Sequence, residues 1–184
     1  GRTGSFLACE QADVTPDILC LSKGITGGSL PLAATLATAP IFDAHYSTDR
    51  SRQFFHSSSY TANPIACAAA NANLAIWRDE PVLDRITTLA QRQAHGLARL
   101  ANVPGLVNPR QMGTIIAIDV QVRDGAGYLS AIGPQLLAFF REHNVLLRPL
   151  GNSVYVMPPY CIEPADLALI YDAIAAAATM VQQA

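Results

Sequence analysis

One lysine, Lys23, has the position in this chain best suited to covalent chemistry. It is the only lysine among 184 residues, so the twelve side chains of lysine and arginine comprise one lysine and eleven arginines. A short apolar run, residues 18–21, leads to Lys23, and a glycine-rich stretch, residues 24–28, follows it. This order predicts a strand that ends in an exposed amine, and such an amine can form a Schiff base with a carbonyl compound. Without its flanking sequence, Lys23 would be better explained as a surface lysine beside a turn.

Two apolar runs are expected to position Lys23. Residues 18–21 and 32–37 are predicted to form short strands on either side of the lysine turn. Continuous apolar runs of this kind are typical of strands in a sheet that is covered on both faces. We therefore expect Lys23 to follow directly on a buried strand.

Helices are expected after the second of these strands. The polar segment 41–54 predicts the start of a helix and then a loop. Asn63 is a good N-cap and Pro64 suits the first helical position, so a helix is predicted from here to about Arg78. The residues expected to pack this helix closely on a sheet are Ala66, Ala69 and Ala70. Pro81 is expected to start another helix, ended by Pro104-Gly105, as a connector into a second unit. Its apolar residues at helical spacing are Val82, Ile86, Leu89, Leu97 and Leu100.

After Gly105 the pattern becomes that of a small α+β domain. Alternating apolar residues predict a half-buried strand at 116–122. The other elements expected here are a turn at 124–127, a helix at 136–143, strands at 145–147 and 154–157 around a hairpin turn at Gly151-Asn152, and a last helix from Glu163-Pro164.

Composition narrows the class of protein. The apolar fraction of 51% supports a sizeable core, and the net charge of −2 argues against a nucleic-acid or membrane-surface role. The four cysteines show neither C-x-x-C pairs nor histidine spacing suited to zinc, so no metal is expected; Cys20 and Cys67 are interpreted as buried. We expect a reducing cytoplasm, no signal peptide and no apolar run long enough to cross a bilayer. The alanine-rich stretch 173–178 is interpreted as a packed helix.

Several phrases of the chain resemble the class III aminotransferases that use pyridoxal 5'-phosphate (PLP). They are Gly1-Arg2-Thr3-Gly4, Asp17-Ile18, Lys23-Gly24, Gly27-Gly28, Pro31-Leu32-Ala33-Ala34, His56-Ser57-Ser58-Ser59-Tyr60 and Asn63-Pro64 with the helix after it. The resemblance covers essentially the whole chain. It implies an α/β fold, the PLP-dependent transferase fold (fold type I). Residues 1–103 are then the C-terminal part of the large PLP-binding domain with a connector helix, and residues 104–184 the small C-terminal α+β domain.

Two later phrases, Leu147-Arg148-Pro149-Leu150-Gly151 and Tyr155-Val156-Met157-Pro158-Pro159-Tyr160, are similar to those of the biotin-pathway members of this class. That resemblance implies amino transfer from S-adenosylmethionine to 8-amino-7-oxononanoate, giving 7,8-diaminononanoate. It also implies a cytoplasmic homodimer whose active site is shared across the interface. Another class III transaminase, acting on an ω-amino acid or a diamine, is the alternative within the class.

The resemblance also implies roles for individual residues. Lys23 is expected to hold the cofactor covalently and, once released, to carry a proton between substrate and cofactor. Ser59 stands at the position of a threonine that contacts the phosphate of the neighbouring subunit's cofactor, and Ser58 is assigned to cofactor binding with it. Thr61 is a rival phosphate donor. Ser57 is left open as a substrate contact.

The substrate side of the expected site lies late in the chain. Arg148 is expected to bind the carboxylate of the keto-acid substrate, because guanidinium and carboxylate match in a two-point fork. Tyr155 is assigned to the same pocket, although a core or edge tyrosine explains it equally well. His56 is interpreted as a structural residue of its loop.

One part of the family's site is expected upstream of Gly1. Members use an aspartate there to bond the pyridinium nitrogen, and ring-stacking aromatic residues lie there too. The chain is therefore expected to be the C-terminal portion of a longer enzyme and to be inactive by itself. A catalytically inert remnant that only self-associates is the alternative outside enzyme function.

Overall fold

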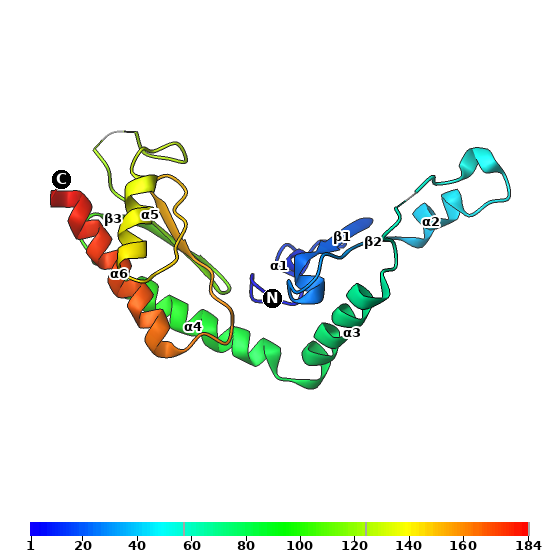
Figure 1. Cartoon of the computed structure of the whole chain (residues 1–184), viewed down its shortest axis with the longest axis horizontal. Coiled ribbons are helices and arrows are strands. Elements are labelled where there is room, and N and C mark those ends of the chain that lie inside the picture. Colours follow the sequence, from blue (N-terminus) through cyan, green and yellow to red (C-terminus); the bar gives the residue numbers. More distant parts are fainter. Residues whose placement is uncertain (57, 124, 184) are drawn as a thin grey trace. The chain divides into compact units, whose positions relative to one another are not determined.

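The structure is a computed structural model that describes residues 1–56, 58–123 and 125–183 (Figure 1). The chain forms two compact units, one of residues 12–82 and one that joins residues 1–11 to residues 83–184. The bounds of these units differ from the expected division into large and small domains after residue 103, which stays a prediction.

The unit of residues 12–82 contains a two-stranded antiparallel ribbon. Strand β1 (Ile18–Ser22) pairs with strand β2 (Ala33–Ala37), in the register Ile18 opposite Ala37 and Ser22 opposite Ala33. The two predicted strands are thus present. Their predicted burial is wrong, because every residue of both strands is exposed or only half-buried. In the described part of the chain this sheet has two strands, so most of its surface stays open.

The cysteine in β1 shares this exposure. Cys20 is exposed and Cys67 half-buried, so the interpretation of both as buried core residues is wrong. The physical reason for Cys20 is the open ribbon on which it lies, and Cys67 lies on the partly covered side of a helix. Among the described residues all four cysteines are free thiols.

Three helical segments follow β2. Helix α2 (Ala39–His45) and the 3₁₀ turn η2 (Arg50–Arg52) come first, as expected of a helix start and a loop. Helix α3 (Pro64–Asp79) begins as predicted, because the side-chain oxygen of Asn63 accepts hydrogen bonds from the backbone N–H of Ile65 (3.0 Å) and Ala66 (3.4 Å). Its buried residues Ala66 and Ala70 belong to a helix that packs on the 3₁₀ turn η1 (Lys23–Thr26).

The second unit is built on a three-stranded antiparallel sheet in the order β3-β4-β5. The strands are β3 (Leu106–Met112), β4 (Ile115–Val120) and β5 (Ser153–Val156). The helices are α4 (Val82–Leu100), α5 (Gly133–Glu142) and α6 (Pro164–Gln183), with the short α1 (Ala8–Gln11) near the start of the chain. Figure 1 shows α5 and α6 beside the sheet. This unit therefore contains helices and an antiparallel sheet after Gly105, as expected, while the bounds of the small domain stay a prediction.

One face of this sheet forms the core with the helices. Ile116, Ile118 and Val120 alternate along β4 and are completely buried, which confirms the predicted half-buried strand. They form one hydrophobic cluster with residues of the helices. The helical members are Leu89, Leu100, Leu136, Phe140, Leu167, Tyr171, Ala173, Ile174, Ala177 and Ala178.

The segment before β5 differs from its prediction. Residues 145–147 form no strand, so that expectation is wrong. Val145 and Leu147 are nevertheless buried in the hydrophobic cluster, so side-chain packing holds this segment in place of the hydrogen bonds of a strand. The hairpin turn at Gly151-Asn152 is present, since Leu150 and Ser153 exchange two backbone hydrogen bonds of 2.9 and 3.1 Å. The expected turn at 124–127 includes Asp124, which lies outside the described residues.

The length and apolar composition of helix α6 differ from the expectation that no apolar run is long enough to cross a bilayer. By length and composition alone it passes as a membrane-spanning helix, with a mean hydropathy of 1.4, the one such helix in the described parts of the chain. Long core helices of other proteins pass the same test. Leu167, Tyr171 and Ile174 of this helix lie buried in the hydrophobic cluster, as expected of a packed helix.

Candidate active site

Lys23 directly follows β1 and has an unusual backbone conformation. Its φ angle is +53°, in the left-handed region that residues other than glycine seldom adopt. Such a conformation costs about 1–3 kcal/mol and is found preferentially at functional sites. The side chain is exposed, and its amine has no hydrogen bond or ion pair to the described residues. The structure thus presents an accessible amine at the end of a strand, with no partner in the part of the chain that it describes.

The turn after Lys23 is closed by its own backbone. The carbonyl of Lys23 accepts from the N–H of Gly28 (3.0 Å), and the carbonyl of Gly24 accepts from the N–H of Gly27 (3.0 Å). Gly27 and Gly28 have φ angles of +63° and +81°, which explains why glycine stands at both positions. The buried hydroxyl of Thr26 donates to the carbonyl of Leu30 (2.6 Å) and completes the turn.

A residue far along the chain also holds this turn. The side-chain nitrogen of Asn73, on α3, donates to the carbonyls of Gly24 (2.9 Å) and Ile25 (3.2 Å). Neither Asn73 nor Thr26 was predicted from the sequence. A signal for Asn73 was present, because it follows Ala66 and Ala70 at the helical spacing of one packed face.

The expected phosphate-binding residues lie in an exposed loop before α3. Ser58 and Ser59 are both exposed, and the carbonyl of Ser58 accepts from the N–H of Thr61 (3.2 Å). The ring of His56 stacks on that of Phe54 at 6.0 Å, an arrangement suited to a structural role. The hydroxyls remain open to an anion, and their part in cofactor binding stays a prediction. Ser57 lies outside the described residues.

Arg148 lies on the other unit, between α5 and β5. Its side chain is exposed, while the adjacent Leu147 is buried and anchors the segment. The guanidinium forms no hydrogen bond or ion pair with the residues that the structure describes, so it is available to a carboxylate.

Tyr155 lies on the sheet face that turns away from the helices. Its neighbours Val154 and Val156 point into the core, and Tyr155 itself is half-buried on the opposite face. Ala117 of β4 pairs with Tyr155 on one side and with Arg110 of β3 on the other. Tyr155 therefore shares its face of the sheet with Arg110.

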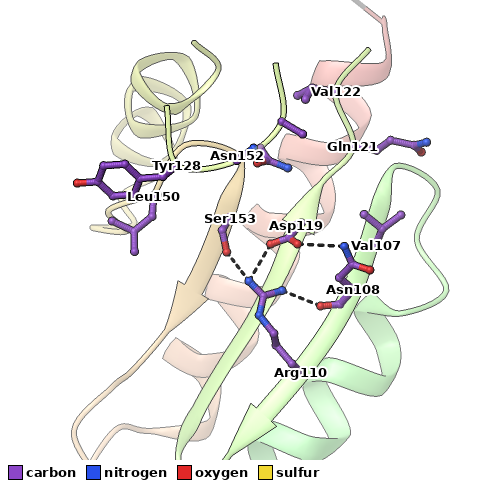
Figure 2. Close-up of a pocket in the computed structure, with 12 residues that line it drawn as sticks. Val107, Asn108, Arg110, Asp119, Gln121, Val122, Tyr128, Leu150, Asn152 and Ser153 are labelled. Carbon is purple, nitrogen blue, oxygen red and sulfur yellow. Dashed lines mark hydrogen bonds and ion pairs between the residues drawn. The ribbon is translucent and has the colours of Figure 1, made fainter. Parts of the chain in front are cut away.

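A polar cluster and an open pocket of about 430 Å³ lie on this face (Figure 2). Arg110 donates to Asp119 (2.9 Å), to the hydroxyl of Ser153 (2.7 Å) and to the carbonyl of Asn108 (2.8 Å). Partial burial alone would raise the pKa of the Asp119 carboxyl, but hydrogen bonds from Arg110, Ser153 and Asn108 outweigh it and lower that pKa. The guanidinium of Arg110 is therefore engaged within the sheet, unlike that of Arg148.

The start of the chain is fastened next to Tyr155. Arg2 donates to the carbonyls of Met157 (2.8 Å) and Pro158 (3.0 Å), which follow Tyr155 in the chain. The carbonyl of Arg2 accepts from the backbone N–H of Thr114 at 2.9 Å. Sequence reasoning did not find this contact, because no local pattern signals it.

Each unit thus assembles a different part of the expected site. The structure brings Lys23 together with Asn73 and Thr26, and it places Tyr155 on the same sheet face as Arg110. The role of Arg148 in binding the substrate carboxylate stays a prediction. In the described parts of the chain, no group of three His, Cys, Asp or Glu residues is arranged to hold a metal ion.

The chain is similar to known proteins over nearly its whole length. An adenosylmethionine-8-amino-7-oxononanoate aminotransferase from Synechococcus elongatus is 45% identical over 95% of this chain, and one from Geobacter sulfurreducens is 38% identical over 94%. The match spans 41% and 39% of those proteins, so the chain covers about two fifths of the length of these relatives.

Solved structures agree with the expected fold. A crystal structure of adenosylmethionine-8-amino-7-oxononanoate aminotransferase from Methanocaldococcus jannaschii matches 98% of this chain and 43% of its own, with a TM-score of 0.88 and 31% identity. An (S)-enantioselective omega-transaminase from Thermomicrobium roseum matches with a TM-score of 0.86 and 30% identity, over 98% of this chain and 41% of its own. The predicted α/β transaminase fold is confirmed.

The family itself follows from a broader comparison. The family model described as "Aminotransferase class-III" matches residues 1–178. Enzymes of this class use PLP, and an amine transaminase from an uncultivated Pseudomonas species with 30% identity to this chain was solved in its PLP-bound form. The cofactor expected from the motifs is therefore that of the family. Given the free amine of Lys23 and this match over almost the whole chain, the chain belongs to the class III aminotransferases.

Proposed function

We propose that this chain is part of an enzyme of biotin biosynthesis that transfers the amino group of S-adenosylmethionine to 8-amino-7-oxononanoate. The observation that carries the proposal is the amine of Lys23, which is exposed and has no partner among the described residues, on a left-handed residue at the end of β1. Support for the substrates comes from the relatives at 45% and 38% identity, both named for this reaction.

The residues of the lysine turn fit a PLP site. The aldehyde of PLP is electrophilic, and the bound ring supplies an electron sink for the electrons of the substrate C–H bond. Lys23 Nζ would anchor the cofactor through that aldehyde, and the released amine would move the proton at the substrate carbon. The exposed hydroxyls of Ser58 and Ser59 are suited to a phosphate.

Arg148 and Tyr155 are proposed to select the acceptor. The acceptor ends in a carboxylate, and Arg148 offers an unengaged guanidinium for a two-point contact. Tyr155 presents a half-buried ring on the open sheet face and is proposed to line the pocket. These two residues orient the substrate rather than react with it.

We further propose that the complete protein is a cytoplasmic homodimer in which Ser58 and Ser59 reach the cofactor of the neighbouring subunit. The exposed aromatic residues of the segment that carries them support burial against a second surface. They are Phe42 (60% exposed), Tyr46 (77%), Phe54 (67%), Phe55 (74%) and Tyr60 (83%).

A second candidate function is favoured by the solved structures. Neighbours with TM-scores of 0.86 and 0.87, at 26% and 27% identity, are omega transaminases. Transfer between an ω-amino acid or a diamine and a keto compound would use the same lysine. A screen of amino donors with the complete protein separates the two reactions, because only the first proposal requires S-adenosylmethionine.

Trapping of the cofactor tests the anchor directly. The chain is incubated with PLP, reduced with borohydride and digested, and the modified peptide is identified by mass. We expect the wild-type chain to carry the adduct on Lys23. In Lys23→Arg the amino terminus is the remaining primary amine, so we expect no adduct at any other position. A wild-type chain that carries no reducible adduct on Lys23 would contradict the assignment. In turnover assays the isolated chain is expected to be inactive.

A further inference from the structure

We propose that Asn73 is a positioning residue for Lys23, which holds the lysine turn in the conformation that presents the amine. This inference rests on the proposed function, because Asn73 matters for the reaction only if Lys23 binds the cofactor. Asn73 touches neither substrate nor cofactor in this assignment. It acts through the backbone that carries the reactive side chain.

The contact is a double one from a distant part of the chain. Asn73 Nδ2 lies 2.9 Å from the carbonyl oxygen of Gly24 and 3.2 Å from that of Ile25, across 49 and 48 positions of sequence. An amide NH₂ group has two protons to donate, and both have an acceptor here. These two carbonyls belong to the two residues directly after Lys23, so Asn73 fixes the turn at the point where the lysine leaves the strand.

The other bonds of the turn are local. Those from Gly27 to Gly24 and from Gly28 to Lys23 join residues three to five apart and move with the turn as a body. They cannot fix its orientation against the rest of the unit. Asn73 does so, because it belongs to the sixteen-residue helix α3, which packs on the turn.

The hydrogen bonds from Asn73 hold a turn that begins with a strained residue, Lys23. A left-handed lysine reverts to a commoner conformation unless its surroundings hold it. The direction of the Cα–Cβ bond depends on φ, so reversion would aim the amine elsewhere. The Asn73 side chain and the turn lie close together, since a Cβ atom on Gly27 would be 3.4 Å from the side-chain oxygen of Asn73. The helix therefore holds both the turn and the direction of the lysine side chain.

Three substitutions in helix α3 test the proposal. Asn73→Ala removes both donors, and Asn71→Ala makes the same chemical change at an exposed position of α3. Alanine raises helix propensity equally at both sites, so folding of α3 is not at risk. Asn73→Asp is a third variant of nearly the same shape that places an oxygen where two carbonyls need a donor.

Two readouts are measured on the full 184-residue chain. The first is the rate at which PLP with borohydride modifies Lys23, followed by mass. The second needs no cofactor: ¹⁵N,¹³C-lysine labelling gives one backbone signal because the chain has one lysine. The one-bond Cα–Hα coupling of that signal differs between positive and negative φ.

We expect Asn73→Ala and Asn73→Asp to slow the trapping roughly 10- to 100-fold, the effect of a small displacement of a reacting group. The coupling should move toward the value for negative φ in both variants, and Asn71→Ala should match the wild type in both readouts. Wild-type rates and couplings in Asn73→Ala, or equal losses in Asn71→Ala, would overturn the proposal. A wild-type chain that traps no PLP refutes the proposed function instead, and the coupling then still decides whether Asn73 holds Lys23.

Discussion

Arg2 and Met157 lie 155 positions apart in the sequence, and the guanidinium of Arg2 donates a hydrogen bond of 2.8 Å to the carbonyl oxygen of Met157. The same nitrogen also reaches the carbonyl of Pro158 at 3.0 Å. The backbone of Arg2 is held in turn by the N–H and the hydroxyl of Thr114, which lie 2.9 and 3.2 Å from its carbonyl oxygen. The segment 1–11 is thereby tied to the sheet beside the strand that carries Tyr155.

Arg2→Ala should loosen this tie and destabilise the unit that contains it. The two side-chain bonds involve a charged donor, but they lie at the surface, so we expect a loss of about 1 kcal/mol in the free energy of unfolding. Urea titration of the chain measures it. Arg141→Ala is the matched control, because Arg141 is exposed and its side chain bonds to none of the described residues. An equal effect of both substitutions would show that the Arg2 contacts contribute nothing specific.

Gly96→Ala should destabilise the core although alanine favours helices. A Cβ atom at Gly96 would overlap the ring of Tyr171, which packs directly on α4. Overpacking of this kind typically costs about 1–3 kcal/mol, more than the gain of up to about 1 kcal/mol in helix propensity. Thermal unfolding checks the sign. Combining Gly96→Ala with Tyr171→Ala makes room for the methyl group, and a cost that persists unchanged in that background would refute the explanation.

The hydroxyl of Tyr171 should make stability depend on pH in the alkaline range. This hydroxyl donates to the side-chain oxygen of the buried Gln93, and burial raises the pKa of Tyr171 above its ordinary value. The raised pKa means that the folded state keeps a proton that the unfolded state loses. Stability is therefore complete below about pH 10, the ordinary tyrosine pKa, and falls as pH rises above it.

Tyr171→Phe provides the comparison. We expect it to cost about 1–3 kcal/mol near neutral pH, because the side-chain oxygen of Gln93 is left buried without its donor. Unfolding free energies measured on both sides of about pH 10 should fall less steeply in this variant than in the wild type. Parallel pH profiles would show that a group other than Tyr171 causes the dependence, since other tyrosines, Lys23 and the cysteines also titrate at alkaline pH.

Arg148→Ala should impair the acceptor half-reaction of a complete enzyme that contains this chain. Loss of a charge-assisted contact to the keto-acid carboxylate is expected to cost about 2–4 kcal/mol in kcat/KM for that substrate. The half-reaction with the amino donor should suffer less. Rapid-mixing measurements of the two half-reactions separate these effects, with Arg141→Ala as the surface control. Equal damage to both would show that Arg148 has a structural role.

Local signals in the sequence predicted the elements that they encode. Asn63-Pro64 marked the start of α3, and the alternation of Ile116, Ile118 and Val120 marked β4, because capping and periodicity depend on near neighbours. The apolar run before Lys23 predicted a strand but not its exposure, since exposure depends on the layers around a sheet. β3 went unnoticed because Pro109 and a shift of register interrupt it.

The contacts that hold the candidate site could not be predicted from local sequence patterns. Asn73 reaches Gly24 across 49 positions, and Arg2 reaches Pro158 across 156. Neither pair has a spacing that a helix or a strand would bring together. Lys23 was found because its flanking motif resembles a known family, whereas Asn73 required the fold to show which backbone it bonds.

The joining of residues 1–11 to residues 83–184 in one unit makes residues 12–82 an insertion within it. During synthesis, Arg2 emerges long before Met157 and Pro158 exist to accept its hydrogen bonds. The entropy cost of closing a loop of this length grows only with the logarithm of the length, so the large separation adds little to it. Segment 1–11 can therefore make these contacts only after β5 and the two residues that follow it have been synthesised.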